Sequence, residues 1–243
     1  MKKGILILIT IFSTAITACA LPIRQTQVRG SGKQTTETRN VGGFEQVALT
    51  GIGNLVILQG NEEGLEISAE DNILPRIVTR VNLATLTIGI EEFVSITPSK
   101  PITYTLRVKN LSGIDASGIG EVNVEELTTK NLDLKISGMG NVKIGRLSAD
   151  GLTAKVSGSG NFNLAGKAAN QTVELSGLGN YTAKDLESQI AVVKISGAGN
   201  ATLWVTQTLE VEISGLGNLS YYGSPSVSQN ISGVGKVNSL GEH

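Results

Sequence analysis

The stretch that decides the fold is Ser137-Gly138-Met139-Gly140-Asn141, and its pattern, Ser-Gly-x-Gly-Asn, returns four more times along the chain. The further copies are Ser157-Gly158-Ser159-Gly160-Asn161, Ser176-Gly177-Leu178-Gly179-Asn180, Ser196-Gly197-Ala198-Gly199-Asn200 and Ser214-Gly215-Leu216-Gly217-Asn218. Degenerate copies begin at Ser117 and Ser232, and an outlying copy is Thr50-Gly51-Ile52-Gly53-Asn54. Successive serines from Ser117 to Ser232 are 18 to 20 residues apart, so this part of the chain is a short internal repeat.

Apolar and polar side chains alternate on both sides of each copy, which indicates β-strands. The position before the serine is apolar in six successive copies, and the position before that is polar or charged. After the asparagine the alternation resumes, as in Val142 and Ile144 or Phe162 and Leu164. Each repeat therefore predicts a strand, a Gly-x-Gly corner, a second strand and a return, in rungs of about 19 residues.

A repeat of this size cannot bury its apolar side chains alone, whereas stacked repeats share one continuous core. The sequence therefore predicts an all-β fold, a parallel β-helix in which equivalent residues lie about 4.8 Å apart. In that register Glu174 lies between Lys155 and Lys194, so neighbouring rungs carry opposite charges. The five asparagines are expected to form a ladder of amides, and the glycines suit corners that need positive φ or close backbone approach.

Residues 41–110 are less regular than residues 111–238, which hold the regular rungs. Further strands are expected at residues 55–58, 65–67, 83–90 and 102–108. Because residues 50–54 already carry the repeat signature, we expect residues 41–243 to form one β-helix domain, with irregular first rungs and a cap over 41–110. A separate small β domain over these residues is the alternative.

The N-terminus has the form of an export signal. Residues 1–19 contain two lysines, an apolar run over 4–16 and a cleavage site of small residues, and the run is too short to span a membrane. The only cysteine, Cys19, stands at the cleavage site, as in bacterial lipoprotein signals, whose cysteine carries a diacylglycerol. We expect Cys19 to be lipidated and to begin the mature chain, with an ordinary secretory signal as the alternative. The polar, unpatterned residues 20–40 predict a flexible tether.

Composition excludes several classes of function. With one cysteine and one histidine, His243, the chain offers no disulfide framework, no cysteine-based zinc site and no histidine-dependent acid–base centre. The balance of 20 basic against 21 acidic residues gives no basic surface for nucleic acid. A strand follows each Gly-x-Gly where a dinucleotide site needs a helix, and asparagine stands where a calcium-binding repeat needs aspartate. We therefore expect no cofactor and no metal.

Two groups of side chains bear on carbohydrate chemistry. The acidic residues fall at differing positions of the rungs, apart from the charged column and the pair Glu125-Glu126, so no catalytic carboxylate cluster is evident. Trp204, Tyr221 and Tyr222 lie near the C-terminal rungs, where they can stack on a sugar ring or simply fill the end of the core. No catalytic residue is assigned. The sequence favours a non-enzymatic protein, and a carbohydrate-binding or polysaccharide lyase-like protein is the alternative.

The rungs, the lead-in Phe44-Glu45-Gln46-Val47 and the lipoprotein-like start together resemble the bacterial autotransporter adhesin head GIN domain family. The resemblance covers residues 40–238. It implies a right-handed parallel β-helix with an adhesion or scaffolding role, and it supplies no catalytic residue. We therefore expect a lipoprotein of the cell envelope, held on the outer membrane if the source is Gram-negative, with a surface glycan or a protein as its partner.

Overall fold

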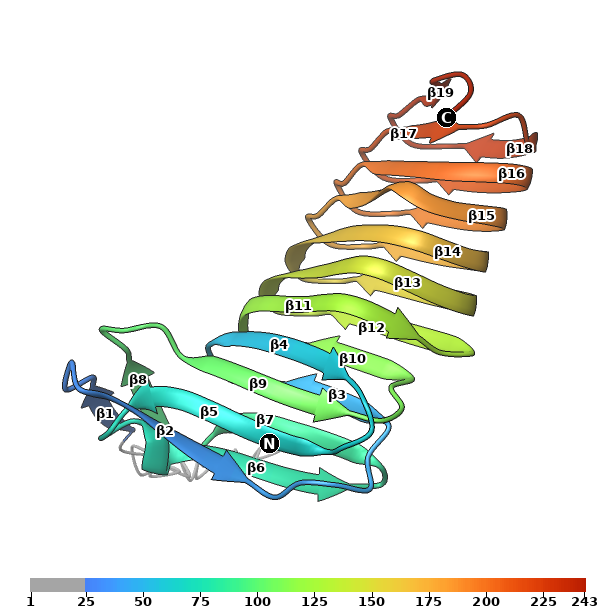
Figure 1. The fold of residues 1–243 in the computed structure, drawn as a ribbon. Coiled ribbons are helices and arrows are strands. Elements are labelled where there is room, and N and C mark those ends of the chain that lie inside the picture. Colours follow the sequence, from blue (N-terminus) through green and yellow to red (C-terminus); the bar gives the residue numbers. More distant parts are fainter. Residues whose placement is uncertain (1–24) are drawn as a thin grey trace, which may run out of the picture.

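The computed structural model describes residues 25–243, and the expected lipidation residue, Cys19, lies outside the described residues. The chain forms a β-solenoid of about 6 turns with rungs of about 20 residues, which confirms the fold expected from the repeat (Figure 1). The strands of the regular solenoid are β10 (Gly113–Ala116), β11 (Ile119–Thr128), β12 (Asn131–Ile136), β13 (Met139–Val156), β14 (Ser159–Leu175), β15 (Tyr181–Ile195), β16 (Ala201–Ile213), β17 (Leu219–Tyr222), β18 (Ser226–Ile231) and β19 (Val237–Ser239).

Each turn contributes one strand segment to each of two parallel sheets. The β12 sheet consists of β10, β12, the later halves of β13 to β16, and β18. The β11 sheet consists of β11, the earlier halves of β13 to β16, β17 and β19. The Ser-Gly-x-Gly-Asn corners join the two sheets within each turn, and they stack along one edge of the solenoid.

The charged column confirms the in-register stacking. Lys155 pairs with Glu174, Glu174 with Lys194, and Lys194 with Glu212 along the β12 sheet. The Nζ of Lys155 lies 3.0 Å from a carboxylate oxygen of Glu174, and the Nζ of Lys194 lies 3.4 Å from one of Glu212. Because these groups are about half exposed, each ion pair contributes at most about 1 kcal/mol, and its value here is as a marker of register.

The core lies between the two sheets. The apolar residues that precede the serines are buried from Ile136 to Ile213, whereas Ile231 in the last turn is 38% exposed. Phe162 and Tyr181 meet edge to face at 6.1 Å in the middle of the stack. The hydroxyl of Tyr181 donates to Oε1 of the buried Gln171 at 2.6 Å, and burial raises the pKa of that tyrosine. The stacked turns therefore share one continuous hydrophobic core.

Close approach of the backbone explains the corner glycines. A Cβ atom on Gly177 would lie less than 3.0 Å from the carbonyl oxygen of Gly158, and one on Gly179 would collide in the same way with Gly160. Among the corner glycines, positive φ occurs at Gly53 and Gly120 in the first two corners. Of the two reasons expected for glycine, close approach between rungs thus accounts for the regular repeats.

The outlying copy at residues 50–54 is the first corner of the same stack. It joins β3 (Gln46–Leu49) to β4 (Asn54–Gln59), which pair in parallel with β10 and β11. The Oδ1 of Asn54 accepts a hydrogen bond from the backbone N–H of Glu121 at 3.2 Å. Below this rung, β7 (Thr85–Ile90) pairs with β3, and β9 (Thr103–Val108) pairs with β4, again in parallel.

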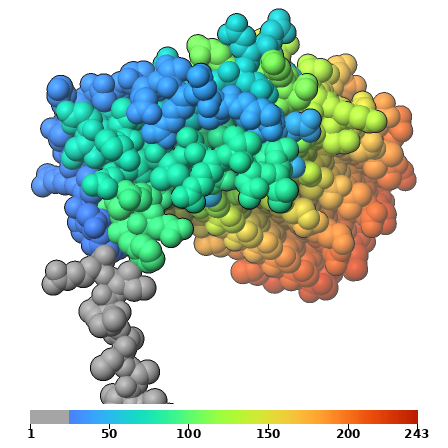
Figure 2. Space-filling view, turned by 90° about the horizontal axis from the view of Figure 1, so that it is seen from below, coloured from blue at the N-terminus to red at the C-terminus, as the bar shows by residue number. Residues whose placement is uncertain are grey.

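Seen from below, residues of the first part of the chain cover the lower end of the solenoid (Figure 2), and antiparallel strands close it. In the β11 sheet, β5 (Gly64–Glu70) pairs with β9, and β2 (Gln34–Arg39) pairs with β5. In the β12 sheet, β6 (Ile77–Asn82) pairs with β7, and a 3-10 helix, Leu74–Arg76, precedes β6. Strands β1 (Thr26–Arg29) and β8 (Val94–Thr97) form a separate parallel pair. Since residues 25–243 hold this cap and the continuous core, we expect them to fold alone, and we call them the 25–243 fragment.

Two expectations were wrong in detail. The flexible tether expected over 20–40 does not extend over residues 26–29 and 34–39, because β2 hydrogen-bonds along the whole of β5 and β1 pairs with β8. The strand expected over 83–90 begins at Thr85, because Leu83 and Ala84 have φ of 47° and 60° and form the two-residue turn of the β6–β7 hairpin. In both segments the backbone hydrogen bonds of the strands, and not an alternation of apolar side chains, fix the conformation.

Candidate binding face

An asparagine ladder lies on the β11 sheet directly after the corners. The Oδ1 of Asn218, at the upper end, accepts a hydrogen bond only from the backbone N–H of Lys236, at 3.2 Å. From Asn141 to Asn200, the Oδ1 of each asparagine accepts a hydrogen bond from the Nδ2 of the next asparagine at 2.9 to 3.2 Å, and another from the backbone N–H of that residue at 3.1 to 3.3 Å. These two bonds use both lone pairs of the oxygen, whereas each Nδ2 keeps a second N–H. The ladder therefore presents an exposed row of donors, with at least one N–H from each of Asn141, Asn161, Asn180, Asn200 and Asn218.

A second outward column runs beside the ladder, two residues further along each strand. It consists of Asn123, Lys143, Asn163, Thr182, Thr202 and Ser220, all half-buried or exposed. We call this column and the asparagine ladder together the amide face. At its lower end the two columns enclose a shallow groove of about 410 Å³, with Glu121, Asn141 and Lys143 among its lining residues.

The upper part of the amide face carries no charge. From Asn161 to Ser220 both columns hold only asparagine, threonine and serine, and the charged residues Glu121, Lys143 and Lys236 lie beyond that stretch. Amide and hydroxyl groups on a flat sheet donate to, and in the second column also accept from, an uncharged polar ligand. Their repeat of about 4.8 Å along the axis suits a chain-like ligand with regularly spaced oxygens.

An exposed apolar column occupies the corners themselves, at the x of Ser-Gly-x-Gly-Asn. Its exposed fractions are 45% for Ile119, 60% for Met139, 63% for Leu178, 62% for Leu216 and 73% for Val234. We call this column, from Ile119 to Val234, the apolar ridge. The signal was present in the sequence, because x is apolar in most copies, but reading the corners only as turns missed it.

The three aromatic residues singled out as glycan contacts do not form one open platform. The ring of Trp204 stacks on His243 with centroids 4.0 Å apart and an interplanar angle of 6°, and Tyr222 meets the same imidazole edge to face at 5.4 Å. Tyr221 packs against the core. Asp185 lies 3.7 Å from the imidazole, and a hydrogen bond from Lys184 is the main cause of its lowered pKa. The structure thus brings Trp204 and Tyr222 together around His243, which covers one face of the indole.

The acidic residues outside the charged column are engaged in ion pairs where they come together. The guanidinium of Arg146 lies 2.8 Å from Glu126 and 3.7 Å from Glu125, and the bond to Glu126 raises the pKa of the arginine. Over residues 25–243 there is no group of three or more His, Cys, Asp or Glu side chains that could hold a metal ion. Within the same range no helix is long and apolar enough to cross a membrane.

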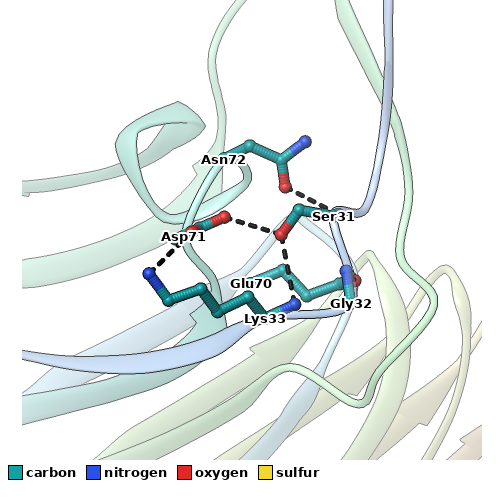
Figure 3. A network of polar contacts seen from close by, with 6 residues as sticks. All are labelled: Ser31, Gly32, Lys33, Glu70, Asp71 and Asn72. Atoms are coloured by element: carbon teal, nitrogen blue, oxygen red, sulfur yellow. Dashed lines mark hydrogen bonds and ion pairs between the residues drawn. The ribbon is translucent and has the colours of Figure 1, made fainter.

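The sequence reading missed a buried carboxylate, Glu70, at the end of β5 (Figure 3). It accepts hydrogen bonds from the backbone N–H of Gly32 at 2.6 Å and of Ser99 at 2.9 Å, and from the Ser99 hydroxyl. These bonds, above all the one from the Ser99 hydroxyl, lower the pKa of Glu70 to about 2. Its only sequence signal was its position directly after the buried strand residues.

The neighbours of Glu70 tie the same elements together. The Ser31 hydroxyl donates to Asp71 at 2.6 Å, and the Nζ of Lys33 lies 3.7 Å from that carboxylate (Figure 3). Asn72 donates to the carbonyl oxygen of Arg29 at 2.7 Å. Since every bond joins the β1–β2 turn or the turn before β9 to the end of β5, the network is a structural clamp for the cap.

Comparison with known proteins agrees with this geometry. The sequence profile of the family described as "Putative auto-transporter adhesin, head GIN domain" matches residues 43–225. A crystal structure described as a putative adhesin from Bacteroides fragilis NCTC 9343 is 29% identical, with a TM-score of 0.85, and the match covers 88% of this chain and 100% of that one. No curated protein matches the chain.

Two structures from Parabacteroides distasonis ATCC 8503 share the fold. One, described as a putative adhesin, is 24% identical, and the other, described as a putative lipid binding protein, is 20% identical. For both, the TM-score is 0.71 and the match covers 88% of this chain and 100% of theirs. At these sequence identities the structural similarity supports only the shared solenoid fold.

Proposed function

The chain belongs to the auto-transporter adhesin head GIN domain family, and from that premise we propose that it is a non-enzymatic adhesin of the cell envelope that binds extended polysaccharide along its amide face. The family and the Bacteroides fragilis structure are both described as putative adhesins. The observation that carries the proposal is the exposed asparagine ladder, whose oxygens all accept hydrogen bonds within the protein while each Nδ2 keeps at least one N–H without a partner there.

The ligand class follows from this chemistry. A row of donors needs a ligand that supplies regularly spaced acceptors, and the hydroxyl and ring oxygens of a polysaccharide do so. Two rungs span about 9.6 Å, roughly the length of one disaccharide unit of an extended glycan. Each contact is weak, but many contacts along one rigid chain add up, and a flat face suits a polymer better than a small molecule.

The second part of the proposal concerns attachment. Cys19 is the only cysteine in the sequence and stands at the expected cleavage site of a segment with the form of an export signal, so we propose that it begins the mature chain and carries a lipid anchor. Buried acyl chains contribute about 0.8 kcal/mol per CH₂, which holds a protein on a membrane without a spanning helix. Replacing Cys19 by Ser is expected to move the protein from the membrane fraction to the soluble fraction. A variant that stays in the membrane fraction would contradict the proposed lipid anchor.

The proposed ligand class is tested with the 25–243 fragment and a panel of immobilised polysaccharides comprising amylose, cellulose, a mixed-linkage β-glucan and mannan. We expect at least one of them to retain the fragment. The double variant Asn163→Arg and Thr202→Arg places two bulky side chains in the second column of the amide face, away from the ladder bonds. It is expected to lower the affinity about tenfold or more.

The matched control places the same two charges on the opposite sheet. Thr153 and Thr172 face outward from the β12 sheet and are half-buried, as Thr202 is. The variant Thr153→Arg and Thr172→Arg is therefore expected to bind as the native fragment does. Failure of every polysaccharide to retain the fragment, or equal binding by the two double variants, would overturn the assignment of the amide face.

A further inference from the structure

The apolar ridge has a pattern that the proposed glycan face does not use. Its residues stack in register from Ile119 to Val234. Large and small side chains alternate through the middle of the ridge, in the order Met139, Ser159, Leu178, Ala198 and Leu216. The ridge is thus a row of projecting side chains about 9.6 Å apart, with a gap between each pair.

The surroundings of the ridge are small and uncharged. A column of exposed serines, from Ser137 to Ser214, borders one side of the ridge. The asparagine ladder borders the other side over the same rungs. An uncharged strip with a row of exposed apolar side chains along its centre is typical of a surface that packs against another protein surface.

We propose that the ridge pairs with the ridge of a second copy of this chain, in antiparallel order. One register places Leu178 beside Ala198 of the second copy, Leu216 beside Ser159 of the second copy, and Met139 beside Val234 of the second copy. Every large side chain in the middle of the contact then meets a small one. A two-fold axis between the rungs of Leu178 and Ala198 repeats the same contacts, as an isologous interface requires.

The expected contact is small. A strip of six rungs and three columns, the serines, the ridge and the asparagine ladder, measures roughly 29 Å by 15 Å, so that pairing buries about 900 Å² in total and covers the ladder that a glycan would contact. That area is below the roughly 1,000 Å² of a stable specific interface, so the pair is a weak, transient one, and we expect it to form at concentrations of about 10 to 100 μM. Many copies held on one surface compensate for weak pairing by their number.

The base of the ridge offers room for the end of the second copy. A groove of about 500 Å³ lies where β8 approaches the first corners, and its lining includes Ile90, Val94, Ile119 and Met139. In the proposed register, Val234 of the second copy lies beside Met139, at the edge of this groove. Glu91 also lines the groove, but its carboxylate is paired with the guanidinium of Arg76 at 2.9 Å, so the groove offers the second copy an apolar lining and no free charge. The apolar groove beside Val234 is the feature that favours this register over the other antiparallel alternatives.

Antiparallel pairing has a consequence that rests on the proposed lipid anchor. β1 lies at the capped end of the solenoid and the last rungs lie at the other end (Figure 1). In an antiparallel pair the two capped ends therefore point in opposite directions. Two anchored copies then pair from facing membranes, so the second copy acts as a partner in contact between cells.

Cross-linking tests the register directly. The 25–243 fragment contains no cysteine. In the double variant Ser159→Cys and Leu216→Cys, the two cysteines of one copy lie three rungs apart, about 14 Å, which is too far for a disulfide. In the proposed pair each lies beside the other cysteine of the second copy, and mild oxidation is expected to give a covalent dimer. Each single variant is expected to stay monomeric on oxidation.

Sedimentation equilibrium tests the association without cysteines. Leu178→Lys with Leu216→Lys is expected to raise the dissociation constant of the dimer about tenfold or more. The control, Leu83→Lys, changes an exposed leucine of the cap that is 93% exposed and is expected to leave the dimer unchanged. The blocking pair on the amide face, Asn163→Arg and Thr202→Arg, is also expected to dimerise, which separates this inference from glycan binding.

Two results would overturn the proposal. A native fragment that stays monomeric up to about 100 μM would exclude ridge pairing at the area estimated. Cross-linking of the single variant Ser159→Cys would show either a parallel arrangement or an antiparallel register with its two-fold axis at Ser159, and both contradict the proposed pair. Neither result depends on a polysaccharide, so the proposed function would be unaffected.

Discussion

The Nδ2 of Asn180 donates a hydrogen bond to the Oδ1 of Asn161, one rung below, at 3.0 Å, and the backbone N–H of Asn180 donates to the same oxygen at 3.1 Å. One side chain thus satisfies two donors of the next rung. The same pair of bonds recurs up to Asn218. The ladder therefore fixes the register of the corners and at the same time exposes the donors of the amide face.

Removing one step of the ladder should weaken the fold. Asn180→Ala removes the oxygen that accepts hydrogen bonds from the backbone N–H and the Nδ2 of Asn200. It also removes the Nδ2 that donates to the Oδ1 of Asn161. We expect the free energy of unfolding to fall by about 1 to 3 kcal/mol, as measured by urea denaturation. Asn163→Ala removes an exposed amide from the same face outside the ladder, and its expected change is below about 0.5 kcal/mol. Equal effects would show that the ladder bonds add nothing.

The corner glycines should tolerate no side chain. Gly179→Ala forces a Cβ against the carbonyl oxygen of Gly160, which belongs to the backbone and cannot move aside alone. The expected loss is about 3 kcal/mol, seen as a lower midpoint of thermal unfolding. At Gly60, by contrast, a Cβ would meet nothing within 4 Å, so Gly60→Ala is the control with little expected change. A stable Gly179→Ala variant would contradict close approach as the reason for the repeat.

Stability should fall in acid because of Glu70. Its folded pKa is lowered from 4.5 to about 2, so the unfolded chain takes up a proton at a pH where the folded chain does not. The stabilisation is therefore complete above about pH 4.5 and is lost as the pH falls toward 2. Glu70→Gln is expected to be less stable at pH 7 and to show a flatter pH dependence in this window. Glu62→Gln changes an exposed carboxylate and serves as the control; an unchanged slope in Glu70→Gln would refute the assignment.

The turn between β6 and β7 should be open to improvement. Leu83 and Ala84 adopt φ of 47° and 60°, which asparagine and glycine accept more readily. Leu83→Asn with Ala84→Gly is expected to raise the free energy of unfolding by about 1 kcal/mol. Leu83→Ala removes the exposed side chain without easing the backbone, and no gain is expected from it. If the double variant is less stable than the native chain, the left-handed turn is not a source of strain.

The sequence could predict the solenoid because its signals are local and repeated. Alternation around Ile195, the charges of Glu174 and Lys194, and the asparagines each report the same register, and the structure has all three. The ladder could be foreseen, although not its bonding. From Asn141 to Asn200 both lone pairs of each Oδ1 are used, which leaves donors as the free groups of the ladder, and this depends on distances between rungs that the sequence does not contain.

The contacts of the cap and the exposure of the apolar ridge could not be predicted from the sequence. Glu70 bonds with Gly32 and Ser99, which are far from it in sequence and share no pattern with it. β2 lies at the edge of its sheet with mostly exposed side chains, so it lacks the apolar alternation that marks a strand. The ridge was visible as the residues Met139, Leu178 and Leu216, but only the structure shows that these corners project from the molecule.

The most direct test of the central claim is the affinity of the 25–243 fragment for oligosaccharides of increasing length, prepared from the polysaccharide that retains it and measured by isothermal titration calorimetry. If the amide face binds an extended chain, the affinity should rise with each added disaccharide, since each spans about two rungs. It should stop rising once the chain covers the uncharged rungs from Asn161 to Ser220. A monosaccharide that binds as tightly as the longest oligosaccharide would contradict the account, because it would mean a single pocket in place of a repeating face.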